Sequence, residues 1–133
     1  MNDMDKYYNY AVEQMGRAAR EKKRYNGYKD KPNRICFYTG TPCADRHEVY
    51  GGTANRQISF YYGFQVDLHP KKHAELHSNA TAWAQEEKQK WRETYQRAYM
   101  DKQMAEWGMD EDDALRAWML LIGKNYLEEC EPK

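Results

Sequence analysis

Residues 46–77, RHEVYGGTANRQISFYYGFQVDLHPKKHAELH, contain all four histidines of this 133-residue chain. Residues 46–50 at the start of this stretch have the pattern of a short strand. The glycine pair 51–52 then marks the end of that strand, since glycines interrupt regular structure. The fold of the middle third of the chain therefore depends on the elements that follow this first strand.

Three further elements are expected before the stretch ends. A short helix is predicted over 56–62, and Gly63 stops it. Residues 64–68 alternate as a strand does. Pro70 is tolerated in the first turn of a helix, so a second helix is expected over 70–77. The predicted order is therefore strand, glycine-rich loop, strand and helix.

The histidines are spaced as in a metal site. His73 and His77 are four residues apart and share one face of the predicted helix. Two imidazoles at that spacing can hold one divalent metal ion, and His47 on the first strand can supply a third ligand. Water and a phosphate oxygen would complete such a site. The alternative is a solvated histidine pair on a charged helix.

Working outward, the rest of the chain is mainly helical. Residues 4–24 predict a helix with a basic end, and residues 35–38 predict a short strand. From residue 80 onward the pattern is helical, with a break at Gly108, a helix cap at Asp110 and an end at Gly123. We expect one α+β domain over residues 1–133. Its parts are a basic N-terminal helix and linker (1–33), a core (34–79) and a C-terminal helical part (80–133).

The composition favours an intracellular protein. The formal net charge is +0, yet residues 1–34 hold nine Lys or Arg against five Asp or Glu, and residues 104–133 hold three against eight. A basic N-terminal arm suits nucleic-acid contact, and two solvated helical faces are the alternative. Three cysteines, an odd number, point to a reducing compartment. The longest apolar cluster, residues 118–122, is too short to cross a membrane.

One family resemblance covers roughly residues 34–127. The middle third and the C-terminal end are similar to HNH (ββα-metal) nucleases of phages and prophages. The matching residues are Cys36 to Gly40, Arg46 to Gly52, Asn55, Arg56, Ser59, Tyr62, Gly63, Val66, Leu68, Pro70 to His73, Ala84, Gln85 and Gly123 to Leu127. The resemblance implies a ββα-metal core over residues 34–79 that cuts a phosphodiester bond with one divalent metal ion, either Mg, Mn, Ni or Zn.

The resemblance also implies roles for individual residues. His47 matches a strand ligand of the metal, Glu48 matches the position of the general base, and His73 with His77 matches the ligands on the helix. Asn55 lies near the loop asparagine of the family. Glu48 replaces the usual histidine, and a carboxylate with a pKa of about 4.3 is a weak base near neutral pH unless burial raises it. An alternative register makes His47 the base and Glu48 a ligand.

Two further groups of residues are left with open alternatives. Arg46, Arg56, Lys71 and Lys72 flank the predicted site, where they either bind phosphates or form a solvated surface. The structural zinc frame of many HNH proteins is incomplete in this chain. Either Cys36, Cys43 and His69 hold zinc with a further ligand, or the two cysteines are small buried residues.

These observations lead to three hypotheses about function. The first is a metal-dependent DNA endonuclease encoded by a phage or prophage, acting in the cytoplasm of the bacterial host. The second is a non-catalytic binding protein on the same scaffold that inhibits a host defence protein or sequesters a nucleotide. The third is an accessory protein in DNA packaging, which only the uneven charge supports. None of the three needs a membrane.

Overall fold

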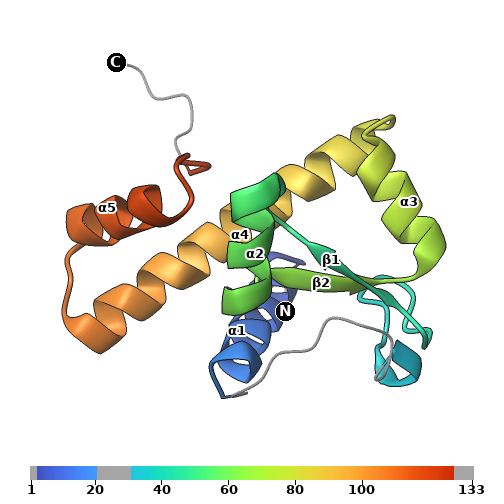
Figure 1. Cartoon of the computed structure of the whole chain (residues 1–133), viewed down its shortest axis with the longest axis horizontal. Helices are drawn as coiled ribbons and strands as arrows, with labels where there is room; N and C mark the ends of the chain where they lie inside the picture. The colour runs from blue at the N-terminus through green and yellow to red at the C-terminus, as the bar shows by residue number, and fades with distance from the viewer. Residues whose placement is uncertain (1–2, 21–30, 128–133) are drawn as a thin grey trace.

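The computed structural model describes residues 3–20 and 31–127, and this part of the chain is α+β. Helices predominate, and two short strands form an antiparallel sheet. The elements, in chain order, are α1 (Asp3–Arg20), the 3-10 helix η1 (Lys31–Asn33), β1 (Asp45–Glu48), α2 (Thr53–Tyr62), β2 (Gln65–Leu68), α3 (Pro70–Ser78), α4 (Ala82–Trp107) and α5 (Glu111–Leu121). Figure 1 shows the long helix α4 passing behind α2, with α3 near one of its ends and α5 near the other.

Helix α4 is the element on which the others pack. It contacts α1, α3 and α5 along its 26 residues. Thr81 caps its first turn by accepting a hydrogen bond from the backbone of Ala84, and Gly108 in the left-handed conformation ends it. Asp110 then caps α5 by accepting from Asp113. The predicted break at Gly108 and the predicted cap at Asp110 are therefore confirmed.

Two tyrosines bind the backbone of β2 on the side away from β1. Strands β1 and β2 pair with His47 opposite Val66 and Arg46 opposite Asp67. The backbone of β2 also bonds away from β1: Tyr95 donates to the carbonyl of Gln65 (2.5 Å), and Tyr10 accepts from the amide of Asp67 (3.0 Å). All four residues of β2 are buried as a result. A two-stranded sheet is marginal alone, so packing against α1 and α4 stabilises it.

The predicted strand over residues 35–38 is wrong. Cys36 opens a turn, in which its carbonyl accepts from Gly40 (2.9 Å) and its amide donates to Thr41 (2.8 Å). Phe37 alone reaches the sheet, with its amide donating to the carbonyl of Asp67 (2.9 Å). The backbone N–H and C=O of Cys36 therefore bond within the turn and are not available to pair with a neighbouring strand.

The other predicted elements are present, with shifted ends. The first strand of the stretch is β1, which starts one residue before Arg46 and stops before Val49. The predicted helices over 56–62 and 70–77 are α2 and α3, and the second strand is β2. Helix α5 ends at Leu121 with Ile122 as its cap, so Gly123 follows the end. Residues 21–24 of the predicted N-terminal helix lie outside the described residues, as does Cys130.

Large aromatic side chains fill the core between these elements. Trp91 and Tyr95 of α4, Trp118 of α5, and Tyr50 and Phe64 beside the sheet are almost fully buried. Their polar atoms find partners: Tyr50 donates to the carbonyl of Arg92 (2.6 Å), for example. Within residues 3–20 and 31–127, no helix is long and apolar enough to cross a membrane.

Candidate functional site

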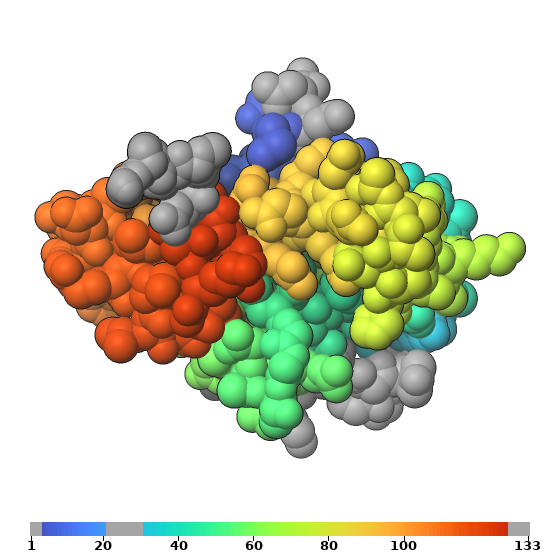
Figure 2. Space-filling model, turned by 90° about the horizontal axis from the view of Figure 1, so that it is seen from above, coloured from blue at the N-terminus to red at the C-terminus, as the bar shows by residue number. Residues whose placement is uncertain are grey.

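A pocket of about 520 Å³ lies between β1, α2, α3 and α4, and it contains three of the four histidines. His47 comes from β1, and His73 and His77 come from α3. Figure 2 shows the surface over this region, where α2 in green meets α3 and the first half of α4 in yellow. The volume falls in the range of roughly 300–1,000 Å³ that is usual for small-ligand sites.

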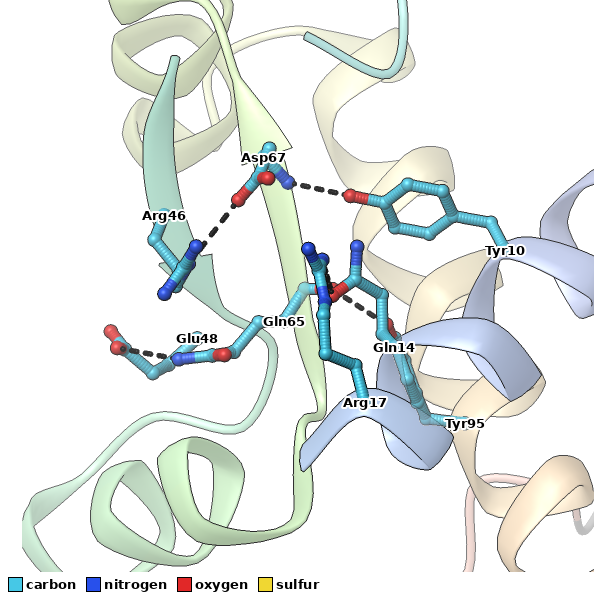
Figure 3. Close-up of polar contacts among 8 residues, drawn as sticks. All are labelled: Tyr10, Gln14, Arg17, Arg46, Glu48, Gln65, Asp67 and Tyr95. Atoms are coloured by element: carbon cyan, nitrogen blue, oxygen red, sulfur yellow. Dashed lines mark hydrogen bonds and ion pairs between the residues drawn. The ribbon is translucent and has the colours of Figure 1, made fainter. Parts of the chain in front are cut away.

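Strand β1 divides its residues between two faces. Side chains alternate along a strand, so Asp45 and His47 share the pocket face, and Arg46 and Glu48 share the other. Figure 3 shows Arg46 directed at Asp67, with a distance of 3.5 Å from Nε to Oδ1. The carboxylate of Glu48 accepts a hydrogen bond from the side-chain amide of Gln65 (3.4 Å). Glu48 also touches the edge of the pocket.

Asp45 orients His73. The Nδ1 of His73 lies 3.1 Å from Oδ2 of Asp45, and Lys31 donates to the other carboxylate oxygen at 2.7 Å. Burial alone would raise the pKa of Asp45, but the hydrogen bonds from Lys31 and His73 bring that pKa below its usual value. Asp45 is therefore a carboxylate at neutral pH. When the Nδ1 of His73 donates to it, the Nε2 keeps a free electron pair, which is how metal-binding histidines are usually oriented.

His47 is held neutral beside His73. Burial is the main reason that the pKa of His47 is lowered to about 3, and electrostatic interactions with His73, His77, Lys88 and Arg92 lower it further. The ring centroids of His47 and His73 are 5.2 Å apart. Two imidazoles that share a metal ion at about 2.1 Å have centroids roughly 5 Å apart, so this pair suits the donor set of a divalent ion.

His77 is less closely engaged. Its side chain is exposed, and its ring lies 6.4 Å from that of His73. In the part of the chain that the structure describes, no group of three or more His, Cys, Asp or Glu is placed to hold a metal ion. A metal ion in this pocket would therefore take His47 and His73 from the protein as they stand, with other positions filled by water, substrate oxygens or a rotated His77.

Three cations line the remaining walls of the pocket. Arg56 comes from α2, and Lys88 and Arg92 come from α4. Burial, and then the charge of Arg92, lowers the pKa of Lys88. The sequence pattern pointed to Arg56 but missed Lys88 and Arg92, because the helical pattern after residue 80 does not show which of its residues face the histidines. The four-residue spacing of Lys88 and Arg92 is the signal that was available.

Other predicted site residues lie elsewhere. Asn55 donates to the carbonyl of Ile122 (3.2 Å), so it ties α2 to the end of α5 and does not line the pocket. Lys72 lies over the ring of Trp83, 4.6 Å from its centroid. Lys71 is exposed on the outer side of α3, and Arg46 faces Asp67. Of the four predicted phosphate-binding cations, the structure brings only Arg56 into the pocket.

The predicted zinc alternative is not assembled. Cys36 is buried and accepts from the amide of Thr39 (3.4 Å), while Cys43 is exposed. His69 uses its Nδ1 to accept from the amide of Lys71 (3.1 Å) and so caps α3. In the described residues these side chains form no metal-holding group.

Comparisons of the chain with family models, with curated proteins and with solved structures return no match. The arrangement of the pocket is therefore the basis for any functional conclusion.

Proposed function

We propose that this protein is a metal-dependent endonuclease of the HNH type that hydrolyses phosphodiester bonds in DNA, encoded by a phage or prophage. The observation that carries the proposal is the pair of facing imidazoles, His47 and His73, with His73 oriented by Asp45. This pair sits on β1 and α3. The order of elements is β1, α2, β2 and α3, so the antiparallel strands are joined through the helix α2 and followed by α3, and this order supports a ββα-metal core with a helix between its strands.

In this proposal His47 and His73 hold one divalent metal ion. Both rings suit that role, because His47 is neutral and His73 has its Nε2 available. When bound, a divalent ion supplies charge stabilisation to the phosphate and to the leaving oxygen. The metal-ligand role for His47 is favoured over the base role, since a group with a pKa of about 3 is a poor proton acceptor near neutral pH.

Glu48 then takes the role of general base. It touches the edge of the pocket, next to His47 in the chain, and its carboxylate has Gln65 as a hydrogen-bond partner. To accept a proton from water in the pocket, the Glu48 side chain must exchange the long hydrogen bond from Gln65 for one from that water. Asn55 acts at a distance, since it holds the start of α2 against the end of α5.

The test joins metal binding to cleavage. We expect calorimetry to give about one divalent ion per chain for the wild type and none for His73→Ala. Cleavage of plasmid and single-stranded DNA should need Mg, Mn, Ni or Zn and should stop with a chelator. His69→Asn is the matched control, because His69 caps α3 outside the pocket and asparagine can also cap a helix. Absence of cleavage with all four metals on both substrates would contradict the proposal.

A second candidate is a non-catalytic binding protein on the same scaffold. It is favoured by the absence of a third metal-holding side chain among the described residues and by the hydrogen bond that occupies Glu48. Such a protein would keep its biological activity in the double variant His47→Ala/His73→Ala and would form a stoichiometric complex with a host protein or bind a nucleotide. Loss of activity in the double variant would decide for the nuclease.

A further inference from the structure

The first half of α4 presents two positive charges to the pocket from outside the β1, β2 and α3 unit. Lys88 and Arg92 are four residues apart and so lie on one face of the helix. Both line the pocket that contains His47 and His73, and Arg56 of α2 lines the same pocket. Three cations from two helices therefore surround a space beside the two imidazoles.

Among the described residues, Lys88 and Arg92 differ from the other cations of α4 because no acidic side chain pairs with them. Lys90 lies 3.4 Å from Glu87, Arg97 lies 3.8 Å from Asp101, and Lys102 lies 2.6 Å from Glu106. By contrast, Arg56, Lys88 and Arg92 make no ion pair with any residue in the ranges 3–20 and 31–127.

The acidic groups nearest the pocket are already engaged. Asp45 accepts from Lys31 and pairs with His73, and Glu48 accepts from Gln65. The pocket lining holds three cations, Arg56, Lys88 and Arg92, against two carboxylates, Asp45 and Glu48, so positive charge is in excess, and no ion pair among the described residues joins these cations to either carboxylate. Unpaired cations in a partly enclosed space raise the local concentration of anions.

Arg92 is also held in place without losing its charge. Its backbone carbonyl accepts from the buried Tyr50 (2.6 Å), and its guanidinium lies 5.8 Å from the ring centroid of Tyr126. An aromatic ring orients a guanidinium but leaves its N–H donors available. A guanidinium so placed can bind two phosphate oxygens at once, which a lysine cannot do.

We propose that Lys88 and Arg92, with Arg56 opposite, form the binding site for a phosphate group of the substrate. This inference rests on the proposed function and deepens it, since it assigns substrate binding to α4. The ligand chemistry is a phosphoryl or phosphodiester anion. It comes either from the backbone of a nucleic-acid strand or from a free nucleotide, and the experiment separates these two sources.

The experiment measures binding in the presence of a chelator, so that it does not depend on a metal ion. Fluorescence anisotropy follows a labelled single-stranded oligonucleotide at several salt concentrations. The test variant is Lys88→Gln/Arg92→Gln. The control is Arg97→Gln/Lys102→Gln, which removes two paired and partly exposed cations from the same helix. Thermal unfolding followed by circular dichroism confirms that both variants are folded.

We expect the test variant to bind at least about 10-fold more weakly, and the slope of log K against log salt to fall by about 0.7, since both cations bind one phosphate and each phosphate contact on single strands contributes about 0.7. The control should change affinity by less than about 2-fold, because its cations are neutralised already. Equal weakening of both variants, or no weakening of the test variant, overturns the inference.

Two additional arms complete the design. Inorganic phosphate and a nucleoside monophosphate are tested as competitors: strong competition by the mononucleotide identifies a nucleotide site, and affinity that rises with oligonucleotide length identifies a strand. If the test variant alone loses binding and the wild type does not cleave DNA, this inference is supported and the nuclease proposal fails. Cleavage by the wild type and equally by the test variant would support the nuclease and overturn this inference.

Discussion

The four residues of β1 divide between two faces with different roles. On one face, Arg46 pairs with Asp67 and Glu48 with Gln65, and Tyr10 and Tyr95 bind the backbone of β2 behind them (Figure 3). On the other face, Asp45 orients His73 toward the pocket and His47 lies neutral beside it.

The difference shows why residue type alone is a poor guide to function. Arg46 and Glu48 are as chemically capable as Asp45 and His47, but they bond to Asp67 and Gln65 of β2, whereas Asp45 bonds to His73 in the pocket. On the pocket face, His73 keeps a ring nitrogen and His47 keeps its lone pair for a ligand. Changes to Asp45 and His47 on the pocket face should therefore affect activity, and changes to Arg46 on the opposite face should affect stability. Glu48 belongs to the opposite face but reaches the edge of the pocket, where the proposal gives it the role of base.

The largest effect is expected from His47→Ala. Because this ring is one of the two protein ligands in the proposal, cleavage should fall at least about 10³-fold, as it does when a member of a catalytic unit is removed. The measurement is the single-turnover cleavage rate with saturating metal. Unfolding by urea should show a folded protein, and a rate within 10-fold of the wild type would contradict the role of His47.

Arg46→Met should act in the opposite way. It removes the ion-pair partner of Asp67 and leaves only the weaker influence of Arg17 and Arg34, in a site where burial raises the pKa of Asp67. We expect a loss of about 3 kcal/mol in the free energy of unfolding, typical of breaking a buried ion pair. At temperatures where the variant is folded, its metal affinity should match the wild type. A large loss of metal affinity with an unchanged free energy of unfolding would show that Arg46 serves the metal site and not stability.

Asp45→Asn tests orientation on the pocket face. Asparagine keeps the size of the side chain but removes the charge that fixes His73. Metal affinity should fall about 10- to 100-fold, the usual cost of losing such a supporting carboxylate. Asp67→Asn, on the opposite face, is the matched control and should leave metal affinity unchanged. Calorimetry on both variants makes the measurement, and equal effects would show that Asp45 has no special role.

The sequence predicted much of the local structure. Periodicity and turn residues placed α2, β2, α3 and the break at Gly108, since these depend on neighbours within a few residues. The four-residue spacing also brought His73 and His77 together. The turn at Cys36 was missed, because a short apolar run has the same pattern whether its backbone pairs with a strand or closes on itself.

The composition of the pocket was harder to predict. Asp45 and His73 are 28 residues apart, so their contact follows only from the pairing of β1 with β2 and the direction of α3. Lys88 and Arg92 reach the pocket because α4 packs against α3, which no local pattern encodes. Alternation along β1 is a local signal that separates Arg46 and Glu48 from His47 and includes Asp45, but the prediction placed Arg46 and Glu48 at the site and did not include Asp45.

The smallest expected effect is on the pH dependence of the free energy of unfolding, measured in the metal-free protein. The pKa of His47 is about 3 in the folded state and about 6.5 in the unfolded chain, so acid favours the unfolded state. The free energy of unfolding that depends on a neutral His47 is fully present above about pH 6.5 and is lost as the pH falls toward 3. Between pH 7 and pH 5 the wild type should lose about 2 kcal/mol through this group.

His47→Gln should lack that part of the loss, and His69→Asn, outside the pocket, should retain it. Urea unfolding at pH 7, 6 and 5 with a chelator gives the comparison, and only differences between variants are used, because other groups also titrate in this range. A single ring on the pocket face then accounts for the difference in acid sensitivity. The same acid loss in His47→Gln as in the wild type would mean that His47 is not held neutral by the pocket, and the argument for its role as a ligand would lose its electrostatic part.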